Sequence, residues 1–63
     1  MLEQAVLREQ VAALLEKERQ AERVYADLAA RSSDPRLRKQ LEELHRDKHR
    51  HIALAERLLE ILE

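Results

Sequence analysis

Apolar residues recur along this chain at alternating steps of four and three residues, in two separate runs. The first run is Leu7, Val11, Leu14, Glu18, Ala21, Tyr25 and Leu28. The second run is Leu37, Leu41, Leu44, Lys48, His51, Ala55, Leu58 and Leu62. This spacing aligns side chains along one seam of an α-helix. The pattern therefore predicts two helices, over about residues 2–30 and 35–62.

The two runs are separated by residues 31–34, which precede the single proline of the chain. Pro35 suits the first position of a helix, and Asp34 or Ser33 can cap the free backbone N–H groups there. A connection this short makes the two helices antiparallel neighbours. The chain is therefore predicted to be all-α, with residues 1–63 forming one antiparallel helical hairpin.

The size of the chain indicates that the hairpin does not stand alone. A domain of about 60 residues buries only about 60% of its unfolded surface, and such scaffolds usually need disulfides, a metal or oligomerisation. The sequence has no Cys, so disulfides are excluded. Further apolar residues flank the seam, and two helices cannot cover them all: Val6, Leu15, Ile52, Leu54, Leu59 and Ile61. We expect the hairpin to dimerise into a four-helix bundle, or to build a larger homo-oligomer.

Three ionisable residues interrupt the apolar seam, namely Glu18, Lys48 and His51. Folding the chain about Ser33 places Glu18 opposite Lys48, with His51 one turn further from the loop. Charged groups inside an apolar seam are costly unless they are paired, hydrogen-bonded or bound to a metal. One interpretation is a buried Glu18–Lys48 ion pair, with His51 bonded to Glu18. The other is a metal site that includes Glu18 and His51.

A second group of polar residues offers another candidate metal site. Glu18 and Glu22 are four residues apart, as are His45 and His49, so each pair shares a helix face. Two carboxylates and two imidazoles suit zinc or another first-row metal if all four converge. The alternative interpretation is a set of exposed salt-bridge partners, because Glu22 and His49 flank the seam rather than occupy it.

Several segments together resemble the ferritin-like superfamily, and most closely its rubrerythrin-type and two-helix, encapsulated-ferritin members. These segments are residues 18–21, Tyr25 with residues 28–29, residues 33–35 with Leu37, and Leu44 with residues 51–52. The resemblance implies a four-helix bundle made by dimerisation, a di-iron centre, and ferroxidase or peroxidase chemistry. Glu18 stands at the place of the family's metal-binding Glu, and Tyr25 at that of a Tyr near the metal.

The resemblance also exposes a departure from the family's Glu-x-x-His pair on the second helix. His51 matches the His, but Lys48 stands where the family has its Glu. The exchange removes a bridging carboxylate and adds a cation. We therefore expect a degenerate metal centre, replaced by a Glu18–Lys48–His51 network, with no cofactor, no catalytic residue and a structural or interaction role. The alternative is an iron- or zinc-binding protein, for metal storage or redox chemistry, with its site between subunits.

Composition narrows the remaining function classes. The formal net charge is −1, and the basic residues alternate with acidic ones, so the sequence predicts no binding to nucleic acid. No apolar run approaches the roughly 20 residues of a membrane span, and no signal peptide is recognisable. We expect a cytoplasmic protein without membrane contact. A third hypothesis is that the hairpin docks on the helices of another protein.

Overall fold

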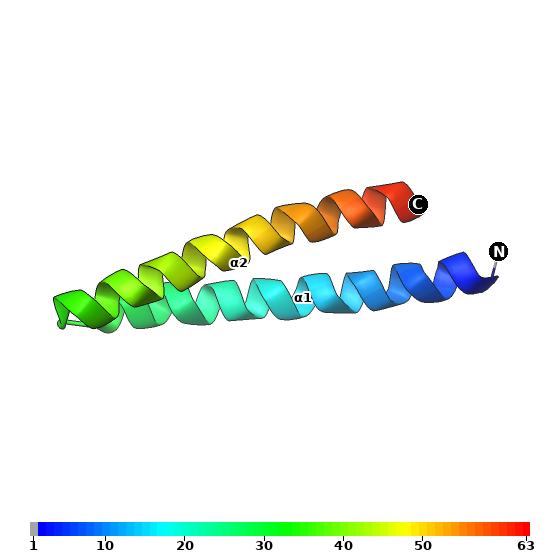
Figure 1. Ribbon diagram of the computed structural model, residues 1–63. Coiled ribbons are helices and arrows are strands. Elements are labelled where there is room, and N and C mark those ends of the chain that lie inside the picture. Colours follow the sequence, from blue (N-terminus) through cyan, green and yellow to red (C-terminus); the bar gives the residue numbers. More distant parts are fainter. Residues whose placement is uncertain (1) are drawn as a thin grey trace.

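The structure, a computed structural model, describes residues 2–63 and consists of two long helices folded back on each other (Figure 1). Helix α1 spans Leu2–Arg31 and helix α2 spans Pro35–Leu62. Together they form a thin rod with principal extents of 50 × 14 × 10 Å. The all-α antiparallel hairpin predicted from the sequence is thus confirmed, and α1 ends one residue later than expected.

Local contacts explain both helix ends at the connection. The side chain of Arg31 donates from Nε to Asp27 Oδ1 at 3.1 Å, and Ser32 N donates to Leu28 O at 3.0 Å, which keeps Arg31 in α1. Asp34 has extended backbone angles, and its Oδ1 accepts a hydrogen bond from Arg36 N at 2.9 Å. Of the two capping residues considered from the sequence, Asp34 is therefore the one that caps α2, with Pro35 at its first position.

The small core lies between the helices, on the half of the hairpin that is nearer the chain ends. Leu15, Ile52 and Ala55 are buried there, with Leu59 packed against them. The sequence analysis placed Leu15 and Ile52 beside the seam, whereas the structure places them at its centre. Successive residues differ by about 100° around a helix axis, so a modest rotation of each helix exchanges Leu14 for Leu15 at the contact.

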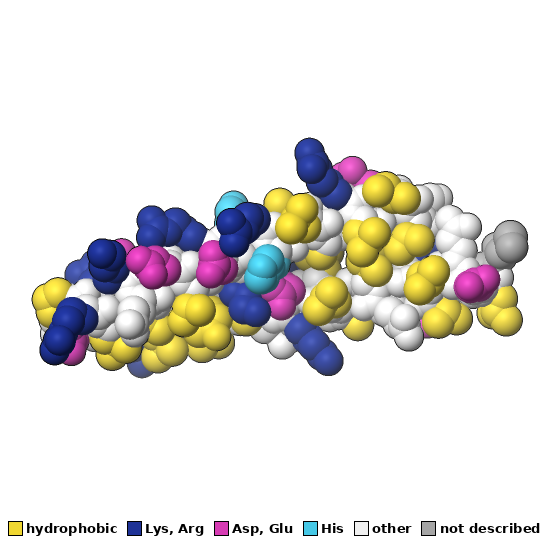
Figure 2. Space-filling view, in the orientation of Figure 1, with side chains coloured by type: hydrophobic (Ala, Val, Ile, Leu, Met, Phe, Trp, Pro, Cys, Tyr) yellow, Lys and Arg dark blue, Asp and Glu magenta, His cyan; other side chains and the backbone are white. Residues whose placement is uncertain are grey.

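Because the helices are rotated in this way, the residues at one heptad position of each helix lie on a face of the hairpin that the other helix does not cover. We call this the open face. These residues are Leu7, Leu14 and Leu28 on α1 and Leu37, Leu44 and Leu58 on α2, all 41–50% exposed. Ala21 and His51 complete the two series. These eight positions make up the open face. Figure 2 shows a face of the rod on which hydrophobic side chains gather toward both ends, with a histidine and charged groups between them.

A groove crosses the open face on the side of the chain ends. It has a volume of about 250 Å³ and is lined by Leu14, His51, Leu54, Ala55 and Leu58. Both helices contribute to it, so the two heptad series border the same groove. Within residues 2–63, neither helix is both long and apolar enough to span a membrane.

Candidate functional site

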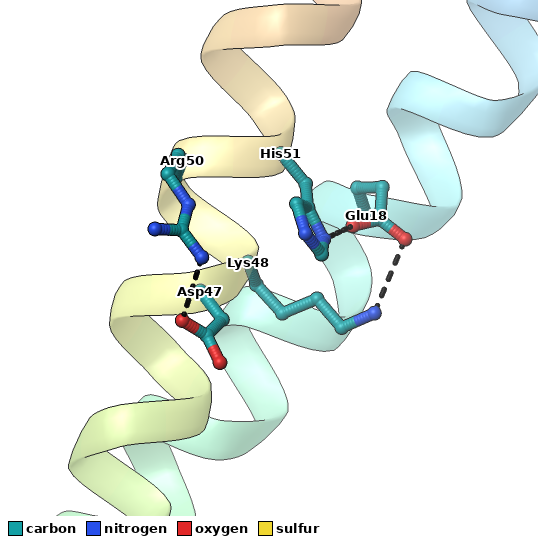
Figure 3. A network of polar contacts seen from close by, with 5 residues as sticks. All are labelled: Glu18, Asp47, Lys48, Arg50 and His51. Atoms are coloured by element: carbon teal, nitrogen blue, oxygen red, sulfur yellow. Dashed lines mark hydrogen bonds and ion pairs between the residues drawn. The ribbon is translucent and has the colours of Figure 1, made fainter.

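Glu18 is the centre of a polar cluster at mid-length of the hairpin (Figure 3). Lys48 Nζ donates to Glu18 Oε1 at 3.2 Å, and His51 Nδ1 lies 3.3 Å from Glu18 Oε2. Lys48 and His51 are three residues apart on α2, so both side chains leave the helix on the same side and reach one carboxylate. A carboxylate only accepts hydrogen bonds, so the contact with His51 requires the proton on Nδ1.

The cluster is covered only in part by the two helices. The side chain of Glu18 is 15% exposed, that of Lys48 is 26% exposed and that of His51 is 49% exposed. Among residues 2–63, no charged side chain is fully buried. The ion pair expected to be buried is thus half-buried in the single chain. His51 lies at the edge of the contact and lines the groove of the open face.

The second candidate group is arranged around Glu22. Glu22 Oε2 lies 2.9 Å from His49 Nδ1, and the side chain of His49 is 76% exposed. His49 and His51 are two residues apart, so they project to nearly opposite sides of α2. The structure therefore divides the acidic residues between two histidines, with Glu18 beside His51 and Glu22 beside His49. His45 is half-buried and lies one turn of α2 closer to the connection than His49.

Metal coordination within the single chain finds no support in this arrangement. Among residues 2–63, no group of three or more His, Asp or Glu side chains is placed to hold a metal ion. The pair of Glu18 and His51 supplies only two ligand groups. A metal site made from this pair and its symmetry copy in a dimer stays a prediction.

Two features of the site were missed from the sequence. The first is the groove beside His51, which is marked by the small Ala55 among the larger Leu54 and Leu58. The second is the exposure of His51, because the heptad pattern does not tell which of two neighbouring helix faces turns toward the partner helix. Asp47 and Arg50, also drawn in Figure 3, form a separate exposed ion pair at 3.2 Å.

Comparisons of the chain with known protein families, with curated proteins and with solved structures found no match.

Proposed function

We propose that this chain is a self-association module, in which two hairpins pack open face against open face to form a four-helix bundle of ferritin-like architecture. The observation that carries the proposal is that three of the four open-face positions on each helix are leucines, which stay 41–50% exposed. Large exposed apolar patches with polar residues around them mark interaction sites in small proteins. The resulting homodimer has a structural or interaction role.

The surface area of the single chain supports the pairing. A compact monomer of this 7.5 kDa mass exposes about 4,200 Å², whereas the hairpin exposes 5180 Å². The difference is about 1,000 Å², close to the roughly 800 Å² that each partner buries in a standard interface. A second copy of the same chain is thus a partner of suitable size and chemistry for the open face.

In this dimer the Glu18–Lys48–His51 cluster occupies the middle of the interface. Its half-buried ion pair becomes more fully covered, and each Glu18 already has a partner for both carboxylate oxygens within its own chain. Lys48 supplies the positive charge that a metal supplies in the family that the sequence resembles. We therefore propose that the cluster replaces a di-metal centre and fixes how the helices align, a role documented for some buried polar groups.

A second candidate function is metal binding between the subunits. The observation that favours it is the position of His51 beside Glu18 at the groove. In the proposed dimer, a second copy would bring another Glu18 and His51 to the same interface. Carboxylate and imidazole groups suit iron or zinc. The protein would then store a metal or use it in redox chemistry.

The homodimer is tested by sedimentation of the purified chain. We expect a species of twice the 7.5 kDa chain mass. In Leu44→Gln, each copy loses about 1 kcal/mol of apolar burial, so the dimer Kd rises about thirtyfold. Leu2→Gln is the matched control, because Leu2 is 84% exposed and lies outside the open face. Sedimentation of the unaltered protein as a single chain contradicts the proposal and favours docking on another protein.

A further inference from the structure

Positive charge gathers on a part of the hairpin that the proposed homodimer leaves uncovered. Residues 19–50, the half of the rod that includes the connection, hold nine basic and six acidic residues, a net charge of +3. The remaining residues hold three basic and seven acidic ones, a net charge of −4. The overall charge of −1 therefore belongs to a rod with one positive and one negative half.

Within the positive half, basic side chains line up along one side of α2. Five positions separated by steps of three, four, three and four residues follow a line along the helix axis. The middle position is Glu43, and the other four are basic: Arg36, Lys39, Arg46 and Arg50. All five residues are exposed. We call them the basic stripe, which is about 21 Å long at 1.5 Å per residue.

The basic stripe lies on the side of α2 that faces away from α1. Arg50 precedes the buried Ile52 by two residues, so the two side chains point about 200° apart around the helix. Leu44, on the open face, is separated from Glu43 by about 100° and from Arg46 by about 200°. The stripe is therefore covered neither by α1 nor by a second copy that packs on the open face.

The cations of the basic stripe have few partners within the chain. Arg50 pairs with Asp47 at 3.2 Å. Among residues 2–63, the other three basic residues of the stripe form no ion pair. By contrast, Arg38 lies outside the stripe on the same helix and pairs with Glu42 at 3.3 Å. The stripe thus presents three cations that are not paired with a carboxylate.

We infer that the basic stripe is a docking surface for an acidic helix of another protein. A straight line of charges at steps of three and four residues fits the side of a second helix, because that helix presents its own side chains at the same spacing. Carboxylates that face the four cations, with an uncharged or basic residue facing Glu43, give complementary charge along the whole contact. The inference goes beyond the homodimer and does not depend on it.

The surroundings of the stripe favour a helix over a uniformly charged partner. Glu43 lies within the stripe and Glu42 and Asp47 lie beside it, so each of them would face the phosphates of a nucleic acid or of a membrane surface. Helix α2 has no Phe, Tyr or Trp on which bases could stack. The stripe also has no apolar residue that could insert among lipids.

A second copy of this chain supplies no comparable acidic line. On the side of α1 that faces away from α2, the exposed positions at steps of four and three residues are Glu9, Ala13, Glu16, Gln20 and Arg23. This line holds only two carboxylates, and Glu16 already lies 3.8 Å from Arg23. The acidic helix is therefore expected from another protein.

Titration with synthetic helical peptides tests the inference. The first peptide carries Glu at four heptad-spaced positions and Gln at the middle one, and the second carries Gln at all five. We expect the acidic peptide to bind at least about tenfold more tightly at about 0.01 M salt. This preference should shrink at about 0.1 M salt, where the screening length falls from about 30 Å to about 10 Å. Equal Kd values for the two peptides overturn the inference.

Variants of the protein locate the binding surface. Arg46→Gln should raise the Kd of the acidic peptide about threefold, and Arg46→Gln combined with Lys39→Gln about tenfold. Arg38→Gln is the matched control, since it removes one positive charge from the same part of α2 outside the stripe, and it should change the Kd by less than about twofold. Equal effects of Arg46→Gln and Arg38→Gln overturn the inference, because only net charge then matters. Circular dichroism verifies that each variant keeps its helices.

Other anionic probes distinguish the class of partner. A single-stranded DNA oligonucleotide and vesicles that contain phosphatidylserine are expected to bind more weakly than the acidic peptide, and tighter binding of either one overturns the inference. Sedimentation of the protein without peptide at low salt should show nothing larger than the proposed homodimer. A larger species that Arg46→Gln removes identifies a second copy as the occupant of the stripe instead. A single chain at every concentration contradicts the homodimer alone.

Discussion

Glu18 and Glu22 lie one helical turn apart and face different surroundings. Glu18 is 15% exposed and contacts both Lys48 and His51. Glu22 is 24% exposed, and its partner His49 is 76% exposed to solvent. Exposed ion pairs contribute little because solvent screens them, whereas removing one member of a covered pair leaves the other charge without a partner. The two residues thus form a natural matched pair for mutagenesis.

We expect Glu18→Gln to lower the free energy of unfolding by about 1–2 kcal/mol, since it removes the charge that faces Lys48. Glu22→Gln should change it by no more than about 0.5 kcal/mol. Urea denaturation at one fixed protein concentration measures both values. Equal effects of the two substitutions would show that the cluster around Glu18 is no better shielded than the surface.

The charge of Lys48 separates the two candidate functions. Lys48→Glu adds a carboxylate beside Glu18, so we expect lower stability without metal and stronger binding of Zn²⁺ or Fe²⁺. A metal present at one hundred times its Kd stabilises the folded state by about 2.7 kcal/mol. The measurement is the melting temperature with and without metal.

Lys17→Glu is the control for this substitution, because Lys17 is an exposed neighbour of Glu18. It changes the net charge by the same amount without altering the cluster. A clear rise in the melting temperature of the unaltered protein on addition of either metal would favour the metal-binding function. Identical behaviour of the two variants would mean that Lys48 does not act through Glu18.

At the scale of the element, the start of α2 depends on one capping side chain. Asp34 Oδ1 accepts the Arg36 N–H, so Asp34→Ala should cost about 0.5–2 kcal/mol. Ser33→Ala, at the preceding exposed position, should leave stability nearly unchanged. In a domain of this size, 1 kcal/mol shifts the melting temperature by about 4–8 °C, which thermal unfolding followed by circular dichroism resolves. A larger loss of stability for Ser33→Ala than for Asp34→Ala would show that Asp34 is not the residue that caps α2.

The helices themselves were predictable because heptad spacing, Pro35 and a capping residue all indicate the same boundaries. The one-residue extension of α1 was not, since it depends on the contact between Arg31 and Asp27. The heptad pattern also did not predict how each helix is rotated about its own axis. Leu14 and Leu15 are equally apolar, and only packing against α2 determines that Leu15 is buried while Leu14 remains 50% exposed.

The candidate site was predictable to a similar degree. Glu18 and Lys48 are equally far from Ser33 along the chain, which was enough to predict that Glu18 lies near Lys48 and His51. The sequence could not tell which carboxylate each imidazole contacts, because that depends on how α2 is rotated against α1. The opposite directions of His49 and His51 follow from the two-residue spacing on a helix, and the rotation of α2 determines that His51 contacts Glu18 while His49 contacts Glu22.

At the scale of the whole molecule, a rod of two helices has a small interior. Its core comprises a few residues near Leu15 and Ile52, while the large side chains of the open face stay half in water. Burial of apolar area is the main favourable term in folding, so the proposed homodimer would gain stability by covering the open face. Folding and association are therefore expected to be coupled.

Coupled folding and association predict that the melting temperature rises with protein concentration, because dimer formation stabilises the folded chain by mass action. Circular dichroism over a wide range of concentrations measures this dependence. Leu44→Gln should shift the whole curve to lower temperature. A melting temperature independent of concentration, at values where the chain sediments as a dimer, would show that each hairpin folds by itself.

The chain ends of the hairpin lie together, as the hydrogen bond from Gln4 Nε2 to the carbonyl oxygen of Leu62 shows. A protein fused to either terminus therefore emerges at the same pole of the rod. Two proteins fused to the two ends of one hairpin are thus held side by side, and the rod, 50 Å long, keeps both of them away from the connection between α1 and α2.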